Sequence, residues 1–534
     1  MNIILDAWLP IRRRHGERET VCFSQLVEED IIDFDFVRED FQGAAYQLAI
    51  AVLQTLYAPE DEFLWQQRYQ WAPTQQELDA VLQTGRHAFE LVAEGENQPR
   101  FMQDFHSLDA AKPSPISGLL IDAPGGNTLK HNTDHFVKRD LYQRISLPMA
   151  AIALFTLQTN APSGGQGHRT GLRGGGPLTT LVLPNDPHAS LWQKLWLNVL
   201  SREVFSYDDP DLHSGAVFPW LEATKESQNP GTEIFAKDVH PLHMYWAMPR
   251  RIRLEVEQVE AVCDLTALSC DQSVRYYRTQ NYGHNYSGSW WHPLTHYRSN
   301  PKKPEDDNLS TKGQPGGVTY KYWHALTFLD QQDGNHPAQV VNTYINRRSG
   351  RRTSYPMIWA FGYDLDNMKC RGWYSTTLPL LSVEARHRDR FLHESKMLQQ
   401  IAIEALKQCR TQIKSAWFVK ASEVKGDISF IDAQFYQRTE RAFYQMLACL
   451  TTNGGELPTD DARRWLSVLQ RTVMDLFDEH VALNNADSSI PKEIARIIAF
   501  RQKLTQWWGG KYIKDYKYRY QIAETSSKSK ERSR

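Results

Sequence analysis

Two kinds of hydrophobic periodicity divide this chain. In its first two-thirds, apolar and polar residues alternate in RIRLEVE (residues 251–257) and in GVTYKYW (residues 317–323), which predicts strands. The β-branched run LTTLVL (residues 178–183) predicts a third strand. Helical spacing predicts one early helix, with apolar positions at Phe41, Ala45, Leu48, Val52 and Leu56. Because strands and helices do not alternate regularly, the predicted fold class is α+β.

From about residue 384 the periodicity is helical throughout. Four successive apolar stripes begin at Leu398, Tyr436, Leu466 and Ile494. The last stripe consists of Ile494, Ile497, Ile498, Leu504 and Trp508. The pattern predicts a large mixed domain over residues 1–383, a C-terminal four-helix bundle over 384–520, and a disordered tail over 521–534.

Length, charge and cysteine content narrow the class of protein. The 534 residues include 61 Lys and Arg against 63 Asp and Glu, which excludes a wholly basic nucleic-acid binder but permits basic patches. The longest apolar runs are far shorter than the ~18 residues of a membrane span. At the N-terminus the basic residues follow the apolar stretch, the reverse of a secretory signal. Six cysteines are too few for a disulfide scaffold. We therefore expect a cytoplasmic protein with no membrane association.

The most unusual segment is APSGGQGHRTGLRGGGP, residues 161–177. It contains seven glycines, with His168, Arg169 and Arg173 between them. Glycine lets a backbone approach a ligand closely, and arginine supplies charge for phosphate. A P-loop is excluded because the segment has no lysine, and Thr170 occupies the position where GxGxxG needs glycine. We expect a loop that lies against a nucleic-acid backbone or groove; a flexible surface loop is the alternative.

Candidate catalytic and metal-binding groups are incomplete. His131 and His135 in HNTDH have the spacing of helical metal ligands, but Asn132 stands where HExxH has its glutamate. Six residues separate Cys263 from Cys270, and no second cysteine pair completes a zinc site. These patterns predict a protein that is not an enzyme and has no cofactor or metal. A metal-dependent nuclease that uses the two histidines remains the alternative.

Two basic patches fall within the predicted bundle and its tail. Residues 501–534 contain ten Lys and Arg against three Asp and Glu. The first bundle helix begins with the basic cluster Arg386, His387, Arg388 and Arg390. Such runs are usually solvated faces. Two of them on one bundle also suit a polyanion, so a general polyanion-binding module is a further alternative.

The chain resembles the large subunit of the type I-E CRISPR surveillance complex Cascade, the CasA family, over nearly its whole length. The resembling segments are residues 2–12, 151–182, 290–293 and 361–373. The resemblance implies a non-catalytic subunit that reads a protospacer-adjacent motif in double-stranded DNA, largely from the minor groove, and starts strand separation. It also implies binding to other Cascade subunits and to the 5′ handle of the guide RNA, and help in recruiting the helicase–nuclease.

The resemblance also assigns residues. The DNA-contacting loop corresponds to Gly164, Gly165, Gln166 and Gly167, with Arg169 after it. The wedge that enters the duplex corresponds to Asp366, Asn367 and Met368, followed by Lys369. The loop that touches the guide handle corresponds to His135, Phe136 and Val137.

The chain departs from the family pattern at three points. Asn367 stands where the best-known form has the longer glutamine, so the preferred motif is expected to differ. The groove-reading lysine has no clear match, and its segment offers Asn281 or His284 instead. The two cysteine pairs that bind zinc in some members are reduced here to Cys263 and Cys270.

Overall fold

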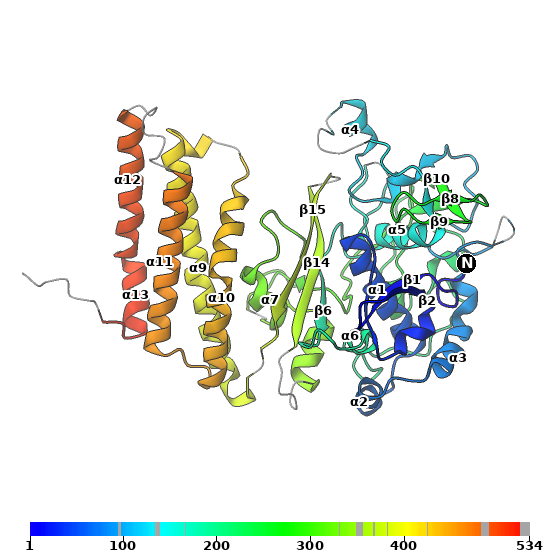
Figure 1. Cartoon of the computed structure of the whole chain (residues 1–534), viewed down its shortest axis with the longest axis horizontal. Coiled ribbons are helices and arrows are strands. Elements are labelled where there is room, and N and C mark those ends of the chain that lie inside the picture. The colour runs from blue at the N-terminus through cyan, green and yellow to red at the C-terminus, as the bar shows by residue number, and fades with distance from the viewer. Residues whose placement is uncertain are drawn as a thin grey trace, which may run out of the picture. The chain divides into compact units, whose positions relative to one another are not determined.

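A computed structural model describes residues 1–93, 95, 98–132, 134, 139–165, 167–330, 332–348, 356–366, 369–381, 383–423, 426–481 and 491–523. The predicted tail beyond residue 523 lies outside this range. The fold class is α+β, as predicted. The chain forms two compact units: Met1–Gln314 with Ala325–Leu378, and Pro315–His324 with Pro379–Arg534 (Figure 1). No helix in the described part of the chain is long and apolar enough to cross a membrane.

The strands of the first unit form small sheets. One has the order β2-β1-β3, from Arg18–Val21, Leu9–Arg13 and Ile31–Phe34. Another pairs β10 (Ser273–Gln280) with β7 (Arg251–Glu257), β4 (Ser114–Pro115) and β5 (Ile145–Ser146). A third has the order β15-β14-β6, from Lys369–Pro379, Met357–Asp366 and Thr179–Leu183. Short pairings complete the set: β8 (Ala261–Val262) with β9 (Ser269–Cys270), and β11 (Tyr297–Arg298) with β12 (Leu309–Ser310) and β13 (Asn335–His336). The strands predicted over residues 251–257 and 178–183 are confirmed.

Two long helices form the centre of the first unit. The predicted early helix is α1 (Glu39–Leu56), and α5 (Leu147–Asn160) is buried on nearly all sides. Asp40, in the first turn of α1, accepts a hydrogen bond from Tyr363 of β14 at 2.5 Å. The other helices are α2 (Glu62–Gln70), α3 (Gln75–Gly85), α4 (Gly126–Lys130), α6 (Leu191–Trp196), α8 (Gln339–Thr343) and a π-helix (Tyr344–Arg348).

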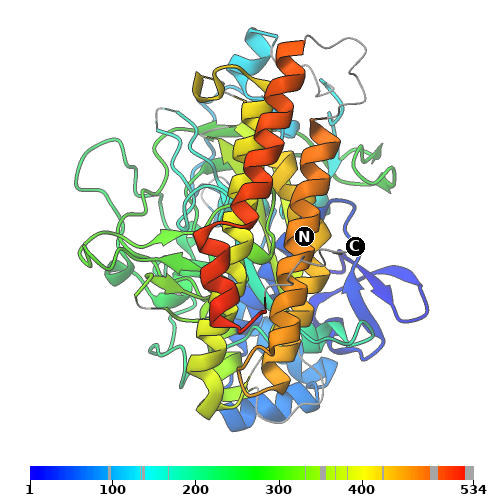
Figure 2. The same cartoon turned by 90° about the vertical axis from the view of Figure 1, so that its left-hand side faces the viewer.

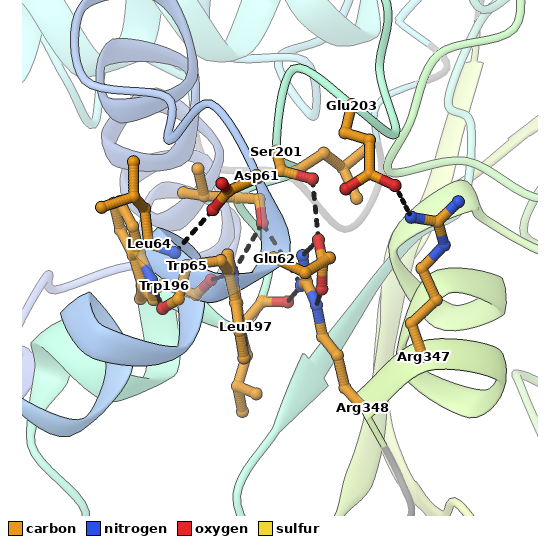
Figure 3. Close-up of polar contacts among 12 residues, drawn as sticks. Asp61, Glu62, Leu64, Trp65, Trp196, Leu197, Ser201, Glu203, Arg347 and Arg348 are labelled. Carbon is orange, nitrogen blue, oxygen red and sulfur yellow. Dashed lines mark hydrogen bonds and ion pairs between the residues drawn. The ribbon is translucent and has the colours of Figure 1, made fainter.

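An ion pair fastens α2 to the rest of its unit (Figure 3). Arg348 donates to both carboxylate oxygens of Glu62 at 2.8 Å, and its guanidinium lies 3.7 Å from the ring centroid of Trp65. Ser201 donates to the same carboxylate at 2.7 Å. Burial raises the pKa of Glu62, but the hydrogen bonds and charge of Arg348 outweigh this and lower it. The pair is therefore charged and bidentate, the stronger class of ion pair.

The second unit is helical. It consists of α9 (Arg388–Trp417), α10 (Ser429–Thr452), α11 (Thr459–His480), α12 (Pro491–Trp508) and the short α13 (Lys511–Arg519), and its long helices lie side by side (Figures 1 and 2). The first three predicted stripes are buried. The fourth prediction was partly wrong, since Leu504 and Trp508 are buried but Ile498 is 44% exposed. The difference arises because α12 is an edge helix, packed against α9 and α11.

The strand predicted over residues 317–323 was wrong. Residues Tyr320–Tyr322 form a 3₁₀ turn that continues into α7 (Trp323–Thr327). Tyr320 is fully buried, its ring stacks on Phe443 at 4.2 Å between centroids, and its hydroxyl contacts that of Thr439 at 2.8 Å. The apolar alternation reflects burial of Tyr320 and Trp323, which a 3₁₀ turn places on one face.

Tyr320 is expected to be essential to the stability of the helical unit. Tyr320→Ala should lower the free energy of unfolding by about 3–5 kcal/mol, the usual cost of deleting a buried aromatic ring. Tyr320→Phe should cost only about 1 kcal/mol, because Thr439 keeps its hydrogen bond to the carbonyl of Phe435. Chemical denaturation of the full chain measures both. Tyr518→Ala, at an 88% exposed position, is the control, and equal stability of the two alanine variants would contradict the assignment.

Candidate nucleic-acid interface

The glycine-rich segment of residues 161–177 connects α5 to β6 as a hydrogen-bonded loop. The amide of Gly171 donates to the carbonyl of Ala161 at 3.0 Å, and that of Gly176 donates to Asn160 at 3.2 Å. Both hydrogen bonds link the loop to the C-terminal end of α5. Four glycines have positive φ angles between 60° and 86°, a region that side chains disfavour: Gly165, Gly167, Gly174 and Gly176.

Most of these glycines are needed for close packing. A Cβ on Gly167 would lie 2.7 Å from the Cβ of Asn281, and one on Gly176 would lie 2.9 Å from the carbonyl oxygen of Tyr363. A Cβ on Gly164 would lie 2.7 Å from Nη1 of Arg250. Gly165, by contrast, is exposed. The loop thus presents backbone to solvent at Gly165 and packs its flanks against the body of the unit. Gln166 lies outside the described residues.

Two other segments hold the loop in place. The amide of Tyr282 donates to the carbonyl of Gly167 at 2.7 Å, and the amide of Ser227 donates to the carbonyl of Tyr282 at 3.0 Å. Arg169 donates to the hydroxyl of Ser227 at 2.8 Å and to its carbonyl at 2.6 Å. Because its guanidinium is engaged there and half-buried, Arg169 positions the loop from within.

Two buried arginines support the loop, Arg173 within it and Arg250 beside it. Arg250 donates to the carbonyl of Pro162, and its Nε has no hydrogen-bond partner among the described residues. Arg173 donates to Gln47 at 2.7 Å and to the hydroxyls of two threonines. Within the described ranges neither arginine forms an ion pair with a carboxylate. Burial lowers the pKa of each to about 10, so both remain positively charged at neutral pH.

The structure separates the two candidates for groove reading. Asn281 is exposed and adjoins Gly167, so it lies at the edge of the loop. His284 is only 5% exposed, and its Nε2 accepts a hydrogen bond from the amide of Lys225 at 3.1 Å. Burial lowers the pKa of His284 to about 4, so this ring is neutral at physiological pH. Of the two side chains, only Asn281 is presented to solvent.

The strand end that precedes the candidate wedge adjoins the glycine segment. Strands β14 and β15 are neighbours in one sheet and are joined by Asn367 and Met368, which lie outside the described residues. Asp366 and Lys369 are exposed at the strand ends. A Cβ on Gly176 would lie 2.9 Å from the side chain of Leu365, so the glycine segment packs against this end of β14. The end of the glycine segment and the described end of β14, which are distant in sequence, therefore lie next to each other.

Lys312 is a further cation at this site that the sequence analysis missed. It is exposed, and it forms an isolated β-bridge with Pro177 at the end of the glycine segment. A Cβ on Gly174 would lie 3.3 Å from its Nζ. In sequence Lys312 falls in a polar stretch with the composition of a solvated loop, so no local pattern distinguishes it from other surface lysines.

The candidate guide-handle loop is described only at its base. Arg139 donates to Asp134 at 2.6 Å and to Asn132 at 2.9 Å, which ties the two sides of the base together. His135, Phe136 and Val137 lie outside the described residues. His131 is exposed. In the described ranges no group of three or more His, Cys, Asp or Glu side chains is placed to bind a metal ion.

Comparison with known proteins identifies the family. The family model for CRISPR-associated protein Cse1 matches residues 2–476. CasA (Cse1) of Thermus thermophilus is similar in structure, with 16% sequence identity, coverage of 94% of this chain and 98% of that one, and a TM-score of 0.64. Cse1 of Thermobifida fusca is also similar, with 16% sequence identity, coverage of 98% of this chain and 99% of that one, and a TM-score of 0.65.

A chain of a structure described as a CRISPR RNA-guided surveillance complex is also similar. The identity is 14%, the match covers 95% of this chain and 99% of that one, and the TM-score is 0.67. At these identities the structural likeness establishes the fold, and the family model, which spans most of the sequence, establishes the relationship. The chain belongs to the CRISPR-associated Cse1 family.

Proposed function

We propose that this chain is the large, non-catalytic subunit of a cytoplasmic, RNA-guided CRISPR surveillance complex, in which it recognises the protospacer-adjacent motif of double-stranded target DNA. Family membership and the similarity to a chain of such a complex support this role. The observation that carries it is the backbone of Gly165, exposed on a loop beside two buried arginines without carboxylate partners among the described residues.

The electrostatics of the loop suit a polyanion. Arg173 and Arg250 are held away from water, so their field is screened less than that of surface lysines. A nearby carboxylate would cancel that field, and none in the described ranges pairs with either residue. The exposed Lys312 adds a cation at the far end of the segment. A phosphate backbone that approaches the loop would be attracted by these cations.

The shape of the loop suits the minor groove. That groove is about 6 Å wide, so a bare glycine backbone enters it more easily than a chain with side chains. Its pattern of donors and acceptors is degenerate, so reading from this side is permissive. Permissive reading of a short motif is sufficient when base pairing with the guide reads the rest of the target. Asn281, at the edge of the loop, would supply side-chain contacts.

Strand separation is assigned to the β14–β15 connection. Asn367 and Met368 would enter the duplex, Asp366 would border them, and Lys369 would bind a phosphate at the exit. Methionine is flexible and apolar, so it can fill the gap beside an unstacked base step. Unstacking a step costs a few kcal/mol, which phosphate contacts elsewhere on the protein would offset.

Assembly is assigned to a separate loop. Phe136, flanked by His135 and Val137, would stack on or insert beside a base of the 5′ handle of the guide RNA, the usual way in which proteins bind unpaired RNA bases. The other partners are the remaining Cascade subunits and the helicase–nuclease that degrades the target, which this chain would help to recruit.

Gly165→Val tests the loop. In the guide-loaded complex we expect motif-dependent binding of duplex DNA to fall about tenfold or more, equivalent to at least ~1.4 kcal/mol, because the new side chain blocks close approach. The measurement is a titration against duplexes randomised beside the target. Gly16→Val is the matched control, since Gly16 is also exposed with positive φ (95°) and open space around it. Equal binding by the two variants would reduce the loop to a spacer.

Lys312→Ala tests the missed cation. Loss of one phosphate contact should lower the slope of log K against log salt concentration by about 0.9. Affinity should fall by a similar factor for every motif, because a phosphate contact carries no sequence information. Lys303→Ala, an exposed lysine in the same polar stretch, should leave the slope unchanged. A change in motif preference by Lys312→Ala would contradict a phosphate contact.

Asn367→Ala combined with Met368→Ala tests the wedge. Opening of a fully paired target should slow, while a target already mismatched beside the motif should be much less affected, because its strands need no separation. Rates of R-loop formation on the two targets give the comparison. If the double variant slows both targets by the same factor, this connection is an affinity contact and not a wedge.

A further inference from the structure

The outer face of α13 (Lys511–Arg519) carries basic and aromatic side chains that the proposed function does not use. Its inner face is fastened to the helical unit by Ile513 and Tyr516, which are 1% and 4% exposed. The hydroxyl of Tyr516 donates to the carbonyl of Ala462 at the start of α11, at 3.4 Å. The helix is therefore a supported element whose outer face points to solvent.

The charge on α13 is mostly unneutralised. Its nine residues include four basic side chains and one acidic side chain, Asp515. Arg519 pairs with Glu394 of α9 at 2.5 Å. For Lys511, Lys514 and Lys517, no carboxylate in the described ranges lies within ion-pair distance. The outer face thus offers free ammonium groups to an anionic ligand.

Exposed aromatic rings accompany these charges. Tyr518 is 88% exposed and Tyr512 is 41% exposed. The ring of Tyr512 also stacks on Trp507 of α12, with 6.2 Å between centroids and 25° between planes. Both rings thus present surface to solvent next to lysines, where a ligand with flat, stackable groups can reach them.

The spacing places the key groups on one face. Lys511, Lys514 and Tyr518 follow one another at three and four residues, so they lie along a single side of the helix. That row covers about 10 Å at the 1.5 Å rise of a helix. Cations that follow a backbone and rings on which bases stack are the two components of proteins that bind single strands without sequence preference.

We propose that this α13 face, formed by Lys511, Lys514 and Tyr518 with Tyr512 beside them, binds single-stranded nucleic acid. Duplex DNA would satisfy the lysines but would leave Tyr518 without an accessible base. An acidic protein surface would also leave the rings unused. The family model ends at residue 476, so this face lies beyond the part of the chain that it matches. The inference does not depend on the glycine segment.

The test uses the purified full chain without guide RNA. Its probes are a fluorescent 20-nucleotide single-stranded DNA of mixed sequence and the same sequence as a duplex, titrated by anisotropy over a series of salt concentrations. Lys511→Gln with Lys514→Gln removes the charges, and Tyr518→Leu removes the aromatic ring. Lys492→Gln with Lys503→Gln is the matched control, since both lysines are exposed on α12 and no carboxylate in the described ranges lies within ion-pair distance of either.

We expect the double lysine variant to lower the salt slope for single-stranded DNA by about 1.4, two contacts at ~0.7 each. Tyr518→Leu should weaken single-strand binding about fivefold or more without changing that slope, and it should leave duplex binding unaltered. Asp515→Asn should have the opposite effect and tighten single-strand binding, because it removes the one acidic charge of the helix.

Three results would overturn the proposal. One is single-strand binding by the α13 variants equal to that of the lysine control. Another is an equal loss on single-stranded and duplex probes after Tyr518→Leu, which would leave only a nonspecific electrostatic patch. The third is single-strand binding that poly-glutamate, added as a competitor at equal total charge, abolishes while Tyr518→Leu has no effect. That result would indicate that the natural ligand of this face is an acidic polypeptide. Because the glycine segment is unchanged in every variant, failure here leaves the proposed role in motif recognition standing.

Discussion

The architecture of the candidate DNA site depends on how closely the backbone of residues 161–177 approaches its neighbours. Cβ atoms on Gly167 and Gly176 would lie 2.7 Å and 2.9 Å from atoms of other segments. Because these positions are glycine, the connection between α5 and β6 packs against Asn281 at Gly167 and against the end of β14 at Gly176. The close approach at Gly176 places this end of the glycine segment beside the described end of β14.

The burial of Arg173 and Arg250 carries an unfavourable desolvation free energy. A guanidinium removed from water without a carboxylate is destabilising unless its donors are satisfied. Arg173 meets this condition with neutral acceptors, the amide oxygen of Gln47 and two threonine hydroxyls. Neutral acceptors satisfy the donors without neutralising the charge. The arrangement leaves the charge of Arg173 unneutralised by its acceptors, whereas in a structural ion pair such as Arg348–Glu62 the two charges largely cancel.

Sequence reasoning succeeded where structure is local and failed where it depends on distant segments. The stripes of α9, α10 and α11 are set by the faces that those helices bury, so periodicity revealed them. Arg169 bonds to Ser227 and His284 accepts from the amide of Lys225, and neither partner is visible in the local pattern. Their assignment to DNA binding stays a prediction. Lys312 gains its place only because folding brings it beside Gly174.

The route of the chain through residues 315–324 has a consequence for dissecting this protein. The polypeptide leaves the first unit after Gln314, contributes Tyr320 to the aromatic cluster of the helical unit, and returns at Ala325 before it enters that unit again at Pro379. The helical unit is thus discontinuous in sequence. A recombinant fragment that begins at residue 379 would contain the long helices α9 to α12 of the helical unit. It would lack Tyr320 and would therefore leave a cavity in the aromatic cluster. After a single cut near residue 379, residues 315–324 would still be covalently joined to the first unit and packed noncovalently in the helical unit.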